Sequence, residues 1–236
     1  MKFSNHVVLV AGGTGGLGRS VSLVFLQEGA SVVVTYQRQD EFEKLRRAAA
    51  PGSTLEGKQV DVTDPSVVGT FVNELLAKHG KLDALVNTVG GYAGGLKLWE
   101  TDPNVFDRMV ALNLRSGYVL SRAVVPAMLK QGRGAIVNVV AKAAVDHAAG
   151  VSAYAASKAA AQAMTDSLAA DLKGSGVRVN SILPSIIDTE VNRKAMPAAD
   201  FSKWPKPEDI ARVILFLCSE EAKLVHGASV PVYGDS

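Results

Sequence analysis

The residues with the clearest capacity for chemistry are Tyr154 and Lys158, in the sequence Tyr-Ala-Ala-Ser-Lys. They are four residues apart in an alanine-rich segment, and a helix places residues at that spacing on one face. A lysine ammonium about 4 Å from a phenol is worth roughly 4 kcal/mol at an effective dielectric of about 20. We therefore expect the lysine to lower the pKa of the tyrosine from ~10 to ~7, the range for acid/base catalysis. The alternative is a solvated pair on an amphipathic helix.

A glycine-rich turn near the N-terminus has the pattern of a dinucleotide-binding loop. It reads Ala11-Gly-Gly-Thr-Gly-Gly-Leu-Gly18 and lies between an apolar run and a helical pattern. Glycines at this spacing permit a tight turn, close approach of the backbone to a pyrophosphate, and tight packing of helix on strand. The N-terminus of the helix adds free N–H groups and a partial positive charge. We predict that the phosphates bind at Gly12, Thr14, Gly15, Gly16, Leu17 and Gly18.

The residues after the second apolar run bear on the choice between NAD and NADP. A carboxylate there would bind the adenine ribose hydroxyls of NAD, but Tyr36 occupies the expected place. Arg38, helped by Arg19, would pair with a 2′-phosphate, because a guanidinium suits that dianion. We therefore expect NADP(H) to be favoured, with NAD(H) possible. The alternative is that Arg38 is a solvated loop residue and that both cofactors are used.

Length and composition narrow the class of protein. The chain has 236 residues, of which 47% are hydrophobic and 20% charged, as expected for one soluble globular domain. A formal net charge of +2 is too small to indicate a nucleic-acid partner. Cys218 is the only cysteine, so no internal disulfide can form, and no apolar run is long enough to span a membrane. We expect a cytoplasmic protein with a small-molecule substrate and no metal, membrane or nucleic-acid partner.

Apolar runs rich in β-branched residues alternate with helical patterns along the whole chain. Continuous apolar strands indicate a sheet that is covered on both faces, and their alternation with helices indicates a parallel, doubly wound α/β sheet of about seven strands. Strands are predicted over 6–11, 31–36, 54–61, 84–87, 135–140, 177–183 and 229–233. Helices are predicted over 16–28, 39–49, 65–79, 103–129, 152–173 and 207–218. The motifs above then lie at the carboxyl ends of strands, where such sheets bind ligands.

Together these motifs resemble those of the short-chain dehydrogenase/reductase family over essentially the whole chain. On that resemblance, Asp61 matches the aspartate that contacts adenine, Asn113 the asparagine of a proton relay, and Tyr154 with Lys158 the acid/base pair. The segment 184–189 matches the stretch beside the nicotinamide, with a serine in place of a glycine. The resemblance implies a homodimer or homotetramer. It also implies further cofactor contacts at Tyr154, Lys158, Val62, Asn87, Val89, Gly90, Pro184, Ile187 and Thr189.

Two departures from the family pattern matter more than the matches. The usual Asn-Asn-Ala-Gly after the fourth strand is here Asn87-Thr-Val-Gly90, followed by Gly-Tyr-Ala-Gly-Gly95. The catalytic serine of the family, thirteen residues before the tyrosine, is replaced by Ala141. Loss of a donor of that kind costs ~10²–10³ in rate, because the serine hydrogen-bonds the substrate oxygen as charge builds there.

Both departures resemble the dihydropteridine reductase branch, which lacks the serine and has a similar glycine-aromatic-glycine loop. The resemblance implies a flat heterocycle lying against Tyr92; the alternative is that Tyr92 only covers its loop. The absence of an acidic residue after the second strand and the sequence of 177–236 fit general family members better, such as oxoacyl-carrier-protein reductases. Met196 belongs to a segment, 190–206, that is predicted to act as a lid over the ligand. The alternative is hydrophobic anchoring of a loop.

These inferences give one expected function and two alternatives. The expected function is an NAD(P)H-dependent transfer of hydride to a small carbonyl, imine or quinonoid substrate, with Tyr154 as proton donor. The substrate would lie against Tyr92, Ala141 and Met196. The first alternative is a ketone reductase of the oxoacyl-carrier-protein type. The second is a non-catalytic NADP(H)-binding sensor, to which the loss of the serine points.

Overall fold

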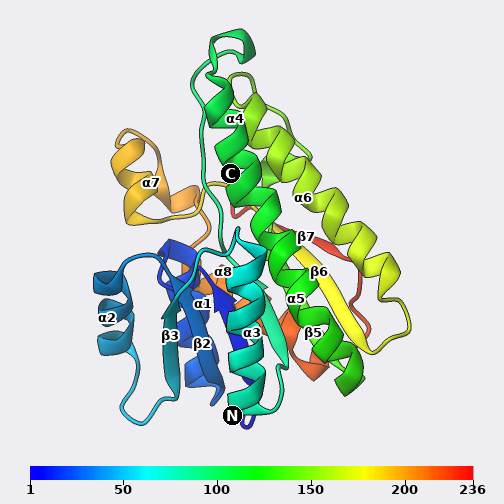
Figure 1. The fold of residues 1–236 in the computed structure, drawn as a ribbon. Coiled ribbons are helices and arrows are strands. Elements are labelled where there is room, and N and C mark those ends of the chain that lie inside the picture. The colour runs from blue at the N-terminus through cyan, green and yellow to red at the C-terminus, as the bar shows by residue number, and fades with distance from the viewer. Residues whose placement is uncertain (236) are drawn as a thin grey trace.

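The computed structural model describes residues 1–235, and seven parallel strands form its central sheet (Figure 1). The strands are β1 (Val7–Ala11), β2 (Ser31–Tyr36), β3 (Leu55–Gln59), β4 (Ala84–Asn87), β5 (Gly134–Val139), β6 (Val177–Pro184) and β7 (Ser229–Val232). Their order in the sheet is β3-β2-β1-β4-β5-β6-β7. The direction of winding therefore reverses between β1 and β4, which is where doubly wound sheets bind ligands.

Eight helices cover the two faces of this sheet among the described residues. They are α1 (Gly16–Gln27), α2 (Gln39–Ala48), α3 (Pro65–His79), α4 (Pro103–Val110), α5 (Ser116–Gln131), α6 (Ser152–Asp171), α7 (Glu190–Ala195) and α8 (Pro207–Cys218). Several ends follow from local sequence. Asp64 caps α3 by accepting from the N–H groups of Ser66 and Val67, and Gly80 ends the same helix with a left-handed φ of 72°.

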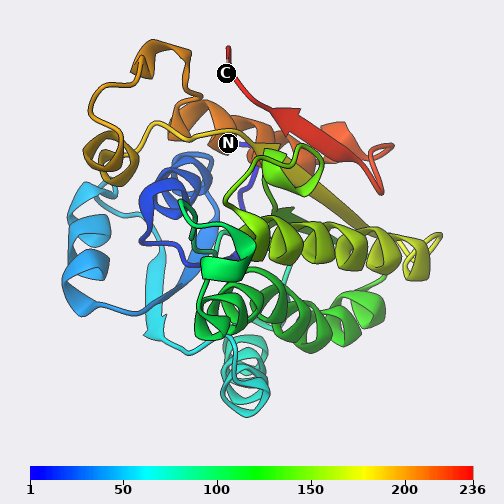
Figure 2. The same cartoon turned by 90° about the horizontal axis from the view of Figure 1, so that it is seen from above.

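The alternation of side chains along β1 divides the core into two layers. Val8 and Val10 pack with residues of α1, α2 and α8, whereas Val7 and Leu9 pack with residues of α3, α5 and α6. Figure 2 shows the two groups of helices on opposite sides of the sheet. The prediction of one doubly wound α/β domain with seven strands is confirmed.

Two predicted elements differ from the structure. The helix predicted over 103–129 is interrupted by a π-helical turn at Ala111–Arg115, where the Ser116 N–H donates to the Ala111 carbonyl five residues earlier. The strand predicted over 54–61 is shorter in the structure, where β3 covers Leu55–Gln59. This edge strand pairs only with β2, and its last pair joins Gln59 to Tyr36, the last residue of β2. Within residues 1–235, no helix is both long and apolar enough to span a membrane.

Candidate active site

The glycine turn between β1 and α1 is shaped by close contacts that exclude side chains. Gly12 has a φ of 72°, and a Cβ at Gly18 would lie 2.1 Å from the Gly12 carbonyl oxygen. A Cβ at Gly16 would lie 2.8 Å from Cγ2 of Thr189, so the end of the β6 segment lies directly against the turn. Among the described residues, no side chain caps α1 at Gly15, which leaves its first N–H groups for an anion. The residues present therefore fit the pyrophosphate of a dinucleotide.

The residues at the end of β2 are held by the neighbouring helix α2. The Tyr36 ring stacks on Phe42 with centroids 4.9 Å apart, and its hydroxyl donates to Gln39 at 2.5 Å. Arg38 forms exposed ion pairs with Glu41 and, at 3.2 Å, with Asp40. Both acids would compete with a 2′-phosphate for this guanidinium, so the role of Arg38 in binding that phosphate stays a prediction.

Asp61 lies in a short turn after β3, and Asn87 is the last residue of β4, before the turn that follows it. The Asp61 carboxylate accepts from the N–H and hydroxyl of Thr63, at 2.9 and 2.7 Å, and these bonds hold the pKa of Asp61 below its usual value. Asn87 Oδ1 accepts from the Val89 N–H at 3.1 Å. Val62 is buried under the first of these turns. These bonds fix the two turns that the sequence predicts to contact the cofactor.

Tyr154 and Lys158 lie one turn apart on α6, as predicted, but the predicted pKa of the tyrosine is wrong for this structure. Burial, and secondarily the charge interaction with Tyr92, raises the pKa of Tyr154 to about 12. The Lys158 ammonium is buried and donates to the Val139 carbonyl at 3.0 Å, and burial lowers its pKa to about 8. The expected lowering fails because desolvation penalises the phenolate and the lysine proton is directed to a backbone carbonyl.

Asn113 holds a loop over this pair of residues. Its Oδ1 accepts from the Gly91 N–H at 2.9 Å, and its Nδ2 donates to the Gly91 carbonyl at 3.1 Å and to Ser157 Oγ at 2.9 Å. A Cβ at Gly90 would lie 2.9 Å from Asn113 Oδ1 and 3.2 Å from Lys158 Nζ, which only glycine avoids. The π-helical turn contains Asn113. Its predicted part in a proton relay stays a prediction.

The segment after β6 leads from the sheet into the predicted lid. Thr189 caps α7 by accepting from the Asn192 N–H at 3.2 Å, and Asn192 also donates to the Ile187 carbonyl at 2.8 Å. Thr189 lies against Gly16, so this segment reaches the glycine turn at its Thr189 end. The predicted contacts of Pro184, Ile187 and Thr189 with the nicotinamide stay a prediction.

The segment 190–206 is anchored by a short series of contacts. The Arg193 guanidinium donates to both carboxylate oxygens of Asp188, at 2.5 and 2.7 Å, and lies 4.9 Å from the centroid of the Phe201 ring. Phe201 in turn packs on the buried Trp204 at 4.9 Å between centroids. Met196, at the end of α7, is half-buried. In Figure 1 this segment projects from the carboxyl edge of the sheet, near α2.

Two aromatic rings and an alanine define the substrate side. Ala141 is buried at the end of β5, so it leaves no hydroxyl where the family has its serine. Tyr92 is 67% exposed and meets the Tyr154 ring edge-on, with centroids 5.0 Å apart. The structure thus brings Tyr92 against Tyr154, and its part as a surface for a flat substrate stays a prediction. No group of three His, Cys, Asp or Glu side chains within residues 1–235 has the arrangement of a metal site.

Comparison with known proteins places this geometry in a family. Residues 6–200 match the sequence profile described as short chain dehydrogenase. The chain is 32% identical to 3-oxoacyl-[acyl-carrier-protein] reductase FabG of Thermotoga maritima, with 99% of this chain and 98% of the relative covered. It is 31% identical to meso-2,3-butanediol dehydrogenase of Serratia marcescens, with 99% and 95% covered. The chain belongs to the short-chain dehydrogenase/reductase family.

Solved structures of the family agree over the same length. The crystal structure of levodione reductase has a TM-score of 0.92 and 26% identity, covering 98% of this chain and 97% of that one. ElxO with NADP bound has a TM-score of 0.91 and 27% identity, covering 99% and 96%. This member of the short-chain dehydrogenase/reductase family is an NAD(P)-dependent oxidoreductase.

Two residues that support the site are missed by reasoning from the sequence. Thr88 donates to the Ala11 carbonyl at 2.7 Å and so ties the β4 loop to the glycine turn. Ser157 accepts from Asn113 and donates to the Tyr154 carbonyl at 2.7 Å. The only signal in the sequence is their position, beside Asn87 and Lys158 respectively.

Proposed function

We propose that this oxidoreductase reduces a small carbonyl, imine or quinonoid substrate and that Tyr154 donates the proton. The observation that carries the proposal is the state of the phenol: burial raises the pKa of Tyr154 to about 12, so it holds its proton at neutral pH. The same ring contacts the exposed Tyr92, on the side open to a substrate. A neutral phenol in that position is an acid available to the reduced product.

The residues of the site divide the chemistry between them. When bound, the nicotinamide supplies a hydride to the electrophilic atom of the substrate. Tyr154 gives its proton to the oxygen or nitrogen on which negative charge builds. Lys158, one helical turn from the phenol and with its pKa lowered to about 8, is largely protonated at neutral pH and donates to the Val139 carbonyl. Asn113 holds Gly91 and keeps the loop over both side chains.

Ala141 narrows the class of substrate. A carbonyl oxygen that gains charge without the serine donor loses ~10²–10³ in rate. A quinonoid or imine-like ring spreads the arriving charge by conjugation and therefore depends less on that donor. The exposed Tyr92 ring offers a surface for such a flat molecule. We therefore propose a conjugated acceptor as the first candidate substrate. The second candidate is a ketone such as the 3-oxoacyl group in the name of the Thermotoga maritima relative.

For the cofactor we infer a preference for NADP(H). No carboxylate follows β2 at Tyr36, where one would bind the ribose hydroxyls of NAD. A surface pocket of about 310 Å³ between α1 and α2 is lined by Arg19 and Arg47, which add positive charge, and by Lys44, which pairs with Asp40 and Glu41. Titration of protein fluorescence with NADPH and with NADH should show that NADPH binds more tightly. Arg19→Gln or Arg38→Gln should reduce this difference in affinity between the two cofactors. Equal affinities in the unmodified protein would contradict this preference.

The lid, the assembly and the location complete the proposal. The Arg193–Asp188 pair and the Phe201–Trp204 contact hold 190–206 beside the β6 segment, where closure would exclude water from the substrate. A homodimer or homotetramer and a cytoplasmic location accord with membership of this family. Sedimentation equilibrium would measure the assembly, and a monomer would contradict it.

Stopped-flow mixing of the NADPH-loaded protein with quinonoid and carbonyl compounds tests the reaction. We expect NADPH absorbance to fall with at least one class, faster with quinonoid acceptors. Tyr154→Phe should abolish that fall, and a fluorescence titration of the same variant should show that NADPH is still bound. If no acceptor oxidises tightly bound NADPH, the protein is a nucleotide sensor and the proposed reaction is wrong.

Ala141→Ser separates the substrate classes. We expect ketone reduction to rise by about tenfold or more and quinonoid reduction to change little, because only the ketone needs the added donor. Ala141→Val is the control, since it changes the side chain without adding a hydroxyl. Efficient reduction of an oxoacyl thioester by the unmodified protein would refute the preference for a conjugated acceptor.

A further inference from the structure

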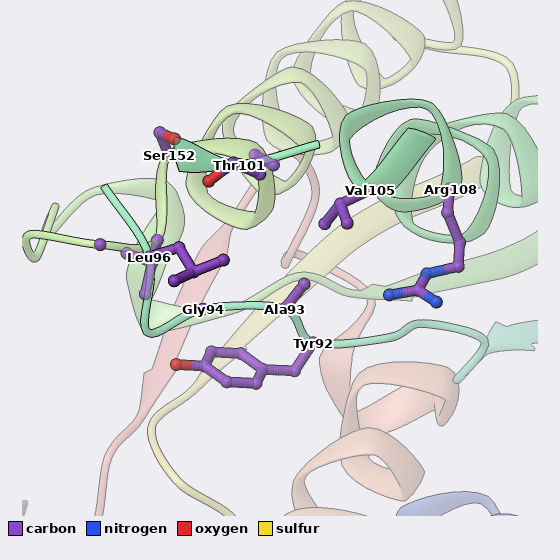
Figure 3. Close-up of a pocket in the computed structure, with 11 residues that line it drawn as sticks. Tyr92, Ala93, Gly94, Leu96, Thr101, Val105, Arg108 and Ser152 are labelled. Atoms are coloured by element: carbon purple, nitrogen blue, oxygen red, sulfur yellow. The ribbon is translucent and has the colours of Figure 1, made fainter. Parts of the chain in front are cut away.

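A cavity of about 340 Å³ lies next to the proposed reaction centre, and apart from Tyr92 its lining has no part in the chemistry described so far (Figure 3). It is bounded by the loop that follows Gly91, by α4 and by the start of α6. Its lining includes Tyr92, Leu96, Thr101, Val105, Arg108 and Ser152. Tyr92 belongs both to this lining and to the edge-on contact with Tyr154. The cavity and the reaction centre therefore share a wall.

The two ends of the cavity differ in chemistry. Arg108 leaves α4 and turns its guanidinium toward the loop at Ala93, as Figure 3 shows. Val105 provides apolar surface between this guanidinium and the other end of the cavity, where Leu96 lies near Thr101 and Ser152. A ligand that fits both parts has an apolar body and an anionic end.

The guanidinium of Arg108 is available for such an anion. Throughout residues 1–235, no carboxylate lies within ion-pair distance of Arg108, whereas Arg38, Arg46 and Arg193 each pair with an acid. A guanidinium presents parallel N–H donors that match a carboxylate or phosphate. Leu96 is 54% exposed, so the apolar part of the cavity is open to an incoming molecule.

We propose that this cavity binds the anionic end of the substrate and that Arg108 selects acceptors that carry an oxyanion on an apolar spacer. The inference rests on the proposed function, because it assigns the reducible group of the same molecule to the Tyr154 side of the shared wall. Arg108 is then a specificity-determining residue. It lies in α4, before the π-helical turn that contains Asn113.

The test compares two forms of one acceptor, a naphthoquinone with a side chain ending in a carboxylate and the methyl ester of that compound. The unmodified protein should prefer the acid by about 10–100-fold in kcat/KM, the range of a charge-assisted hydrogen bond. Arg108→Gln should remove the preference by raising KM for the acid alone, and Arg108→Lys should restore part of it. Arg122 is an exposed arginine of α5 outside the cavity, so Arg122→Gln is the matched control and should leave the preference for the acid unchanged.

Failure of this proposal can be told apart from failure of the proposed reaction. Calorimetric titration of the acid into Tyr154→Phe loaded with NADPH measures binding when no hydride can be transferred. Binding that weakens about 10–100-fold with Arg108→Gln supports the subsite even if neither compound oxidises NADPH. Equal binding with and without Arg108, or an acid preference that survives Arg108→Gln, overturns it.

Discussion

The buried ammonium of Lys158 gives a prediction that depends on one physical cause. Burial lowers the pKa of Lys158 from 10.5 in a free side chain to about 8. Between these values the unfolded chain binds more protons than the folded one, so the free energy of unfolding rises with pH. Below pH 8 the folded protein bears the full cost of keeping the ammonium charged, which is roughly 3 kcal/mol at neutral pH.

The magnitude follows from the two pKa values. The cost is about 3 kcal/mol near pH 7 and about 1 kcal/mol near pH 9.5, a difference of about 2 kcal/mol. Lys158→Met removes the titrating group and keeps a side chain of similar length. The free energy of unfolding of the variant minus that of the unmodified protein should therefore fall by about 2 kcal/mol between these pH values. The lost hydrogen bond to the Val139 carbonyl shifts both values equally and does not enter the difference.

Urea unfolding followed by fluorescence of Trp99 and Trp204 measures these free energies by linear extrapolation. Protein concentration must stay fixed, because assembly adds to apparent stability. Lys173→Met, at an exposed position after α6, is the control and should give the same difference at both pH values. If Lys158→Met behaves like the control, burial does not depress this pKa and the electrostatic account of the site is wrong.

Three other predictions concern single groups. Gly18→Ala should weaken NADPH binding at least ~10-fold in a fluorescence titration, because the new Cβ would lie 2.1 Å from the Gly12 carbonyl oxygen and the turn must move; unchanged affinity would refute the tight-turn geometry. In an ultraviolet difference titration, the cofactor-free protein should show a phenol that ionises at about pH 12, because burial raises the pKa of Tyr154 to about 12. This transition should be absent from Tyr154→Phe. A lost transition near pH 10 would contradict the stated burial effect. Cys218 is buried with its pKa raised to about 12, so a thiol reagent should label it only as fast as the protein unfolds, and rapid labelling of the native protein would show an open site.

Much of the fold could be predicted because its pattern is local. Apolar β-branched runs such as Val7–Ala11 are buried at every residue, and the glycine turn that follows has close contacts that exclude side chains. The spacing of Tyr154 and Lys158 fixed them on one face of α6. These features need only a few neighbouring residues to be understood.

The failures required knowledge of distant neighbours. The pKa direction of Tyr154 depends on desolvation and on Tyr92, which is distant in sequence, and Lys158 meets a carbonyl of β5. The π-helical turn has no composition signal, because the helical pattern continues through Asn113. Arg108 is an ordinary exposed arginine until the loop after Gly91 folds across it.

Ala141 and the neutral phenol bear on the direction of the reaction for the same reason. Oxidation of an alcohol needs a base, and a phenol whose pKa is raised to about 12 holds its proton at neutral pH. Reduction needs an acid, which this phenol already is, and Lys158 is charged below about pH 8 and donates to the Val139 carbonyl. The missing serine slows reduction most for a substrate that concentrates negative charge on one oxygen. A conjugated acceptor that takes up hydride before a proton avoids that loss, so the acid-ready tyrosine and the absent hydroxyl favour the same reaction.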